Sequence, residues 1–255
     1  MGKKISRRRN SGKIEFLEKA LLKNGHANRD GPVRKKWTTH DLANVKPLTP
    51  TQEEMFHAFF NNQHICAYGS AGTGKTFLAL YLALTAVLRR PQDQSKIIIV
   101  RSVVPTREVG HLPGTLEEKT LPYEIPYRDI LHELVGRHST YDDMKNAGLV
   151  EFMTTSFIRG LTWEDAIVIV DEGQNMSFHE INSIMTRLGD NSRVIFTGDL
   201  NQSDLTRKYD VSGMNRFLRV TKNMNEFDQI RFTVHDIVRS AFVKAWITAT
   251  ENIAV

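Results

Sequence analysis

Residues 69–76 read Gly-Ser-Ala-Gly-Thr-Gly-Lys-Thr, a pattern typical of loops that bind phosphate groups. The glycines let successive backbone N–H groups point inward, and a helix predicted to begin near Lys75 adds the positive end of its dipole. Lys75 is then placed to contact the β- and γ-phosphates, and Thr76 to bind Mg²⁺. The predicted nucleotide-binding residues of this segment are Gly69, Ser70, Ala71, Gly72, Thr73, Gly74, Lys75, Thr76 and Phe77.

Two carboxylates, Asp171 and Glu172, directly follow the apolar run Ile-Val-Ile-Val at residues 167–170. Ligands of parallel sheets bind at the carboxyl ends of the strands, so both side chains are expected beside the phosphates. Asp171 is predicted to hold Mg²⁺ through water, and Glu172 to orient or deprotonate an attacking water. The alternative is that the pair only ends a strand and caps the next helix. Together with the phosphate loop, the pair predicts a nucleoside triphosphatase.

Other polar side chains could recognise the nucleotide. Asp199 ends a second apolar run, and it could sense the γ-phosphate together with Gln202, although a Gly-Asp turn is the competing interpretation. The amide of Gln52 could pair with N6 and N7 of adenine and thereby select ATP. The segment from Thr49 to Gln52 is equally a helix capping box, and the sequence does not separate these two roles.

Two arginines could stabilise the charge that develops on a transferring phosphoryl group. Arg239 lies in a helix predicted over residues 236–250, where a local ion pair with Asp236 is the alternative. Arg101, at the end of a predicted strand, is a second nucleotide-binding candidate. The sequence leaves open whether Arg239 serves its own chain or a neighbour.

The elements that must position these residues alternate between short apolar runs and longer helical stretches, which indicates an α/β fold with a parallel sheet flanked by helices. The predicted strands are residues 64–68, 96–101, 166–170 and 193–197, with 150–154 and 230–234 as further candidates. The predicted helices are residues 50–61, 75–90, 127–137, 178–188, 213–221 and 236–250. Residues 103–124 show no clear period.

Charged residues are distributed unevenly along the chain. Of its 34 Lys and Arg and 29 Asp and Glu, residues 1–48 contain thirteen basic and four acidic side chains, so a net charge of +5 combines a basic arm with a mildly acidic body. We predict an N-terminal arm over residues 1–47, partly disordered, and one ATPase domain over residues 48–255. The arm is either a contact for polyanions or a solvated tail. One cysteine and no apolar leader or membrane span predict a reducing, cytoplasmic setting.

The order of the motifs resembles the PhoH-like ATPases, which are related to the motor core of superfamily 1 helicases. The resemblance rests on Gln52, the phosphate loop and residues 171–175, 197–202 and 236–239, and it covers roughly residues 48–245. Residues 112–119 resemble the Leu-Pro-Gly-x-x-x-x-Lys segment of the family. Residues 157–162 resemble its Arg-Gly-Arg-Thr stretch, with Leu161 in place of the second arginine. The short arm is similar to that of compact bacteriophage versions, for which the setting would be the host cytoplasm.

The resemblance implies a single RecA-like P-loop NTPase domain that uses ATP and Mg²⁺. Because the chain has the length of only one motor lobe, it also implies a homo-oligomer, with a hexameric ring favoured, in which a neighbour completes each site. Candidate contacts to single-stranded RNA or DNA combine aromatic, hydroxyl and basic groups, although aromatic residues buried in the core are the alternative. These candidates are Ser156, Phe157, Arg159, Trp163 and the basic arm.

Three functions follow, in this order. The first is an ATP-driven motor on single-stranded nucleic acid, similar to a helicase or translocase. The second is an ATP-switched assembly or regulatory protein that binds no nucleic acid. The third is a small-molecule phosphotransferase with residues 103–124 as a lid, which fits less well because Glu172 beside Asp171 suits water as the acceptor.

Overall fold

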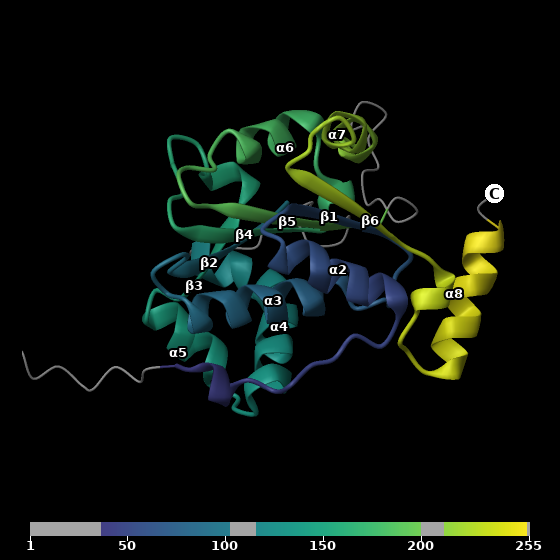
Figure 1. Cartoon of the computed structure of the whole chain (residues 1–255), viewed down its shortest axis with the longest axis horizontal. Helices are drawn as coiled ribbons and strands as arrows, with labels where there is room; N and C mark the ends of the chain where they lie inside the picture. The colour runs from purple at the N-terminus through teal and green to yellow at the C-terminus, as the bar shows by residue number, and fades with distance from the viewer. Residues whose placement is uncertain (1–36, 103–115, 200–211, 254–255) are drawn as a thin grey trace, which may run out of the picture. The chain divides into compact units, whose positions relative to one another are not determined.

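The computed structural model describes residues 37–102, 116–199 and 212–253. The described residues from Trp37 onward form one compact unit, in which helices cover both faces of a central sheet (Figure 1). Helices α2, α3, α4 and α5 lie on one face, and α6 and α7 on the other. Among the described residues, no helix has the length and apolar character needed to cross a membrane.

The sheet has six parallel strands in the order β3-β2-β4-β5-β1-β6. All carboxyl ends therefore meet at one edge, and β5 lies between the strand that enters the phosphate loop and the strand that ends at Asp171. The α/β fold with a parallel sheet is confirmed, as are all six predicted strands, although β6 is displaced. The strands are β1 (His64–Gly69), β2 (Lys96–Arg101), β3 (Val150–Thr154), β4 (Ala166–Asp171), β5 (Arg193–Gly198) and β6 (Phe227–Phe232).

The larger core cluster lies under α2 (Pro50–Phe60), α3 (Lys75–Arg89), α4 (Leu116–Val135) and α5 (Thr140–Asn146). Helix α3 supplies seven buried apolar residues, which fixes the helix that begins at the phosphate loop firmly against the sheet. Alternate residues of β2 and β4 complete this cluster, because side chains of a strand point to opposite faces.

The second core cluster lies under α6 (Phe178–Met185) and α7 (Met214–Thr221). The ring of Phe196 from β5 lies 4.4 Å from that of Phe217 on α7, measured between centroids. Cys66, the single cysteine of the chain, is fully buried in this cluster, and burial raises the pKa of its thiol.

Besides β6, three helices differ most from the sequence prediction. Helix α4 begins at Leu116, although residues 103–124 showed no period, and it contains Pro122 and Pro126. Helix α5 was not predicted. Helix α8 spans Ala241–Ile253, so it begins later than the predicted residues 236–250. The Asp236 carboxylate instead accepts hydrogen bonds from the backbone N–H and hydroxyl of Thr233, which closes a 3₁₀ turn at Val234–Asp236 before the helix can start.

Residues 37–47 were assigned to the basic arm, but the structure places them on the domain. Trp37 is only 8% exposed, and Leu42 and Val45 pack against the larger core cluster. The N–H of Ala43 donates to the carbonyl of Leu134 in α4. In Figure 1 this segment runs past α4 and α3 to the start of α2. Residues 1–36, the rest of the predicted arm, lie outside the described residues.

Candidate nucleotide-binding site

The phosphate loop lies between the end of β1 and the start of α3, as predicted. At Gly69 the backbone has φ +118°, and a Cβ there would lie 1.9 Å from the carbonyl oxygen of Phe232 in β6, so only glycine fits. The N–H of Ser70 donates to that same carbonyl, which ties the loop to the edge strand. The free N–H groups at the start of α3 then face the carboxyl edge of the sheet, where they can solvate an anion.

The Lys75 ammonium folds back onto its own loop. It lies 2.8 Å from the Gly69 carbonyl oxygen and 2.7 Å from that of Ser70. Burial lowers the pKa of Lys75, whereas the nearby carboxylates of Asp199, Glu172 and Asp171 act in the opposite direction. A lysine held this way is ready to exchange carbonyl partners for phosphate oxygens.

Asp171 lies at the end of β4 and reaches the first turn of α3. Its Oδ1 accepts hydrogen bonds from the Thr76 hydroxyl at 2.8 Å and from the Thr197 hydroxyl at 2.5 Å. The predicted pair Thr76 and Asp171 is thus brought together from residues 95 positions apart. Thr197, the second-last residue of β5, was not predicted as a partner of this carboxylate.

Glu172 has a left-handed backbone with φ +54°, an unusual conformation for a non-glycine residue. The amide of Gln174 donates to Glu172 Oε2 at 2.5 Å and accepts from the N–H of Asp199 at 2.9 Å, so it bridges the ends of β4 and β5. Burial and then the charge of Asp171 raise the pKa of Glu172. A carboxylate with raised basicity and a fixed orientation suits a general base.

Gly173 allows this bridge to form. A Cβ at this position would lie 2.0 Å from the ring of Phe196, so any side chain would push the 3₁₀ turn Gly173–Asn175 away from β5. The sequence indicated Glu172 and Asp199 separately, and Gln174 lies in the segment 171–175 that carries the resemblance, but nothing in the sequence showed that its amide joins them.

A cavity of about 500 Å³, which is large enough for a nucleotide, lies at this edge of the sheet, and its lining includes Lys75, Thr76, Asp171, Glu172, Thr197 and Asp199. The predicted residues among its lining are Gln52, Ala71, Gly72, Thr73, Gly74, Lys75, Thr76, Phe77, Asp171, Glu172, Asp199 and Arg239. Sequence reasoning missed the wall formed by Val45, Lys46, Leu48, Ile130, Glu133 and Val238. These residues come from three separate segments and share no short motif, so only the folded chain reveals them.

The side-chain amide of Gln52 makes hydrogen bonds within the protein. Its Oε1 accepts from the N–H of Leu48 at 2.7 Å, and its Nε2 donates to the carbonyl of Thr73 at 3.0 Å. The Thr49 hydroxyl accepts from the Gln52 N–H, which caps α2. Gln52 therefore fastens the start of α2 to the phosphate loop, and its recognition of adenine remains a prediction.

The two predicted arginines lie in different places. Arg239 lines the cavity of its own chain, and the N–H of the preceding Val238 donates to the carbonyl of Gly72. It lies between the 3₁₀ turn and α8 rather than within the predicted helix, and the described residues contain no ion pair between Arg239 and Asp236. Arg101 is not among the residues that line the cavity, so the structure does not support it as a nucleotide contact. Gln202 lies outside the described residues.

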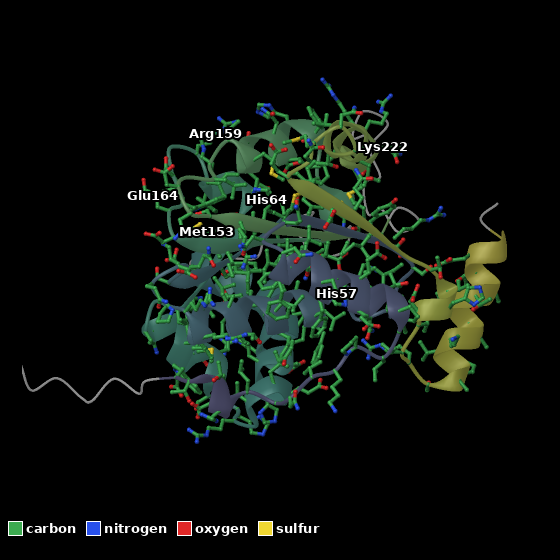
Figure 2. The ribbon with its side chains drawn as sticks, viewed as in Figure 1. His57, His64, Met153, Arg159, Glu164 and Lys222 are labelled. Carbon is green, nitrogen blue, oxygen red and sulfur yellow. The ribbon has the colours of Figure 1, made fainter. Side chains whose placement is uncertain are left out.

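The predicted strand-binding residues separate into two groups. Ser156, Phe157 and Arg159 are exposed just beyond the end of β3, and Figure 2 labels Arg159 on the side of the sheet that carries α6. Trp163 is only 2% exposed and belongs to the second core cluster, so its prediction as a strand contact is wrong. Its ring contributes to the core because the segment before β4 turns inward there, with the Trp163 N–H bonded to the carbonyl of Arg187.

Helix α8 contacts the phosphate loop from the outside. The Ser70 hydroxyl donates to Glu251 Oε2 at 3.1 Å, and a Cβ at Gly72 would lie 3.3 Å from Ile247 Cδ1. The opposite surface of α8 exposes Phe242 and Trp246 at 77% and 64%. Helix α8 is therefore in direct contact with the phosphate loop at Ser70 and at Gly72, and Gly72 lines the cavity.

A parallel sheet, a glycine-rich loop that opens a helix, and two carboxylates at the carboxyl end of β4 together define a P-loop NTPase. The family model described as PhoH-like protein matches residues 44–251. The chain belongs to the PhoH-like family, which confirms the resemblance of its motifs.

The relatives are longer than this chain. A PhoH-like protein of Bacillus subtilis (strain 168) is 35% identical over 209 residues, which cover 82% of this chain and 64% of the relative. Protein PhoH of Escherichia coli (strain K12) is 34% identical over 224 residues, which cover 86% of this chain and 62% of the relative. The chain thus spans less than two thirds of the length of these proteins.

Solved structures show a more distant similarity. Pif1 helicase from Candida albicans is 14% identical with a TM-score of 0.43, and the match covers 82% of this chain and 44% of the helicase. The Sulfolobus solfataricus SWI2/SNF2 ATPase core in complex with dsDNA is 14% identical with a TM-score of 0.41, covering 78% and 47%. Scores this low support no conclusion about activity.

Proposed function

We propose that this chain hydrolyses ATP with the help of Mg²⁺ and uses the energy as a motor on single-stranded nucleic acid. One observation carries the hydrolysis proposal: Lys75, Asp171 and the oriented Glu172 line the same cavity. The apolar side chains of Val45, Leu48, Ile130 and Val238 offer a wall for the nucleobase.

In the proposed reaction, a water oxygen forms a bond to the γ-phosphorus while the bond from that phosphorus to the β–γ bridging oxygen breaks. ADP leaves with the electron pair. Glu172, held by Gln174, orients the water and accepts its proton. Lys75 moves from the carbonyls of its loop to the phosphates, and Arg239 at the cavity wall stabilises the charge on the equatorial oxygens.

The residues present fit Mg²⁺. Thr76 and Asp171 offer two oxygen atoms 2.8 Å apart, both facing the cavity. Within residues 37–102, 116–199 and 212–253, no group of three or more His, Cys, Asp and Glu could hold a metal by itself. This suits Mg²⁺, which uses one or two protein ligands and takes its other oxygens from phosphates and water. When bound, the ion would neutralise negative charge on the phosphates.

The proposal of a nucleic-acid substrate rests on two features. Phe157 is 54% exposed next to the exposed Ser156 and Arg159, which provides an aromatic surface with a hydroxyl and a guanidinium for an unpaired strand. Residues 1–36 contain most of the basic side chains of the predicted arm. The test measures ATP turnover with and without single-stranded RNA and DNA, together with the oligomer mass in the same buffer. Turnover that neither strand stimulates would contradict a motor.

Removing residues 1–36 is expected to weaken strand binding and to reduce its salt dependence while sparing basal ATP turnover. Each lost contact to a single-stranded phosphate lowers the slope of log affinity against log salt by about 0.7. The cut precedes Trp37 because that residue is buried in the domain. Fluorescence anisotropy of a labelled oligonucleotide at several salt concentrations measures the slope. An unchanged slope would show that the arm is a passive tail.

An ATP-switched assembly protein is the second candidate, and the contact of α8 with the phosphate loop favours it. The same helix touches Ser70 through Glu251 and exposes Phe242 and Trp246, so a nucleotide that moves α8 would also move an apolar surface. A ring, with a hexamer favoured, is compatible with both candidates. Sedimentation that depends on ATP, without strand binding, would select this second function.

Glu251→Gln is expected to tighten ATP binding about threefold, because it removes a like charge beside the loop that receives the phosphates. The amide of Gln can still accept from the Ser70 hydroxyl, so the position of α8 is largely kept. Titration with a fluorescent ATP analogue measures the effect. Glu164→Gln, at an exposed position labelled in Figure 2, is the control. Equal affinities in the two variants would mean that the phosphates do not approach Glu251.

A further inference from the structure

The phenol of Tyr127 meets the carboxylate that is proposed to hold Mg²⁺. Tyr127 lies in α4, is fully buried, and donates its hydroxyl proton to Asp171 Oδ2 at 2.8 Å. The other oxygen of Asp171 accepts from Thr76 and Thr197. Three hydroxyl groups from α3, α4 and β5 thus surround one carboxylate that is itself only 4% exposed.

Binding of a metal would break one of these three hydrogen bonds and keep the other two. Thr76 is proposed to turn its oxygen to the metal, so its bond to Asp171 would be lost. Tyr127 and Thr197 remain, one on each carboxylate oxygen. The tyrosine then fixes the rotation of the carboxylate, because it alone among these donors holds Oδ2.

The side chain of Arg101 in β2 lies close to Tyr127. The charge of Arg101 interacts with the Tyr127 hydroxyl, and its guanidinium carbon lies 5.8 Å from the ring centre of Tyr123, one turn earlier in α4. Arg101 also pairs with Asp171 in the register of β2 and β4. Arg101 does not line the cavity, but it lies beside the two residues that share the hydrogen bond to Oδ2.

We infer that Tyr127 is a positioning residue for Asp171 and that its hydroxyl sets the affinity of the site for Mg²⁺. The inference rests on the proposed function, since it assumes that Asp171 holds the metal of a metal–nucleotide complex. Groups that orient metal ligands from outside the coordination shell typically change metal affinity or activity by about 10- to 100-fold when removed.

The chain offers a matched control. Tyr141 in α5 is also fully buried, and its hydroxyl donates to Glu124 Oε2, an equally buried carboxylate, at 2.7 Å. Neither Tyr141 nor Glu124 lines the nucleotide cavity. Tyr127→Phe and Tyr141→Phe therefore remove the same group from the same kind of bond, and they differ only in which carboxylate loses it.

The experiment titrates MgCl₂ into full-length chain with a fluorescent, non-hydrolysable ATP analogue. Tyr127→Phe should raise the half-saturating Mg²⁺ concentration about tenfold, whereas Tyr141→Phe should stay within about twofold of the wild type. Analogue binding in EDTA should be equal in all three proteins. An unchanged Mg²⁺ dependence in Tyr127→Phe, or an equal shift in both variants, would overturn the inference.

Thermal unfolding gives a second measurement if a variant is less stable. At one subsaturating Mg²⁺ concentration, the metal–analogue complex should raise the Tm of Tyr127→Phe by less than that of the wild type or Tyr141→Phe. Equal increases would contradict the inference. None of these measurements requires hydrolysis. A wild-type chain that binds the complex but does not turn over ATP would contradict the proposed activity, while the role of Tyr127 in Mg²⁺ binding could still be tested.

Discussion

Glu172→Gln is expected to bind ATP with Mg²⁺ at close to wild-type affinity and to hydrolyse it about 10²- to 10⁴-fold more slowly. The substitution keeps the size of the side chain, and its amide oxygen can still accept the hydrogen bond from Gln174. It removes the basic oxygen that is proposed to take the proton of water. Single-turnover hydrolysis and analogue binding, measured on the same preparation, separate the chemical step from affinity.

Glu151→Gln is a suitable control for this variant. Glu151 pairs with Lys96 at 2.9 Å, and neither residue lines the cavity. The control should therefore turn over ATP at the wild-type rate. Wild-type turnover in Glu172→Gln would show that another residue orients the water, and Asp199, at the end of β5, would be the next to test.

Lys75→Ala is expected to reduce ATP turnover about 10³-fold or more, and to weaken ATP binding as well. The ammonium is the only described Lys or Arg group within the phosphate loop itself, and it faces Asp171, Glu172 and Asp199. Without this positive charge, the negative charges of the three carboxylates would repel the phosphates. A filter-binding assay together with phosphate release measures both effects.

The matching control is Lys96→Ala. It removes a lysine of similar partial exposure whose partner is Glu151. Circular dichroism should show both variants folded, since the Lys75 side chain bonds only to carbonyls and a hydroxyl of its own loop. Undiminished turnover in Lys75→Ala would place the phosphates elsewhere and remove the basis of the proposed mechanism.

The strands that carry the site could be predicted closely because each is an uninterrupted apolar run. The apolar run of β4 ends at Val170, one residue before the strand itself ends at Asp171, and every residue of that strand is buried. The edge strand β6 was predicted three residues too late. Its buried side chains alternate with exposed ones, and the β-branched residues after Phe232 belong to a capped turn that begins at Thr233.

Helix α4 could not be predicted over its full length because local preference argues against it. Two prolines remove hydrogen bonds inside the helix, and tertiary contacts compensate for them. Among these contacts are the bond of Tyr127 to Asp171 and the contacts of the buried Glu124 with Tyr141 and Lys145. The sequence contains each of these residues, but nothing in their spacing shows that they meet.

Contacts between residues that are distant in the sequence also account for what was missed in the site. The phosphate loop and Asp171-Glu172 are contiguous, so a short pattern identifies them. Gln174 belongs to the motif that carried the resemblance, yet its bridge to Asp199 depends on how β4 and β5 align. Trp163 shows the opposite error, because an aromatic residue near exposed basic and hydroxyl groups looked like a binding residue and is a core residue instead.

The buried position of Cys66 makes this chain convenient for spectroscopic labelling. Its thiol is inaccessible and its pKa is raised, so maleimide dyes should leave it unmodified in the folded protein. As Cys66 is the single cysteine, a new cysteine at the exposed Trp246 would carry the dye alone, without the prior removal of any native thiol. A fluorophore there would test in real time whether α8 moves as nucleotide enters and leaves.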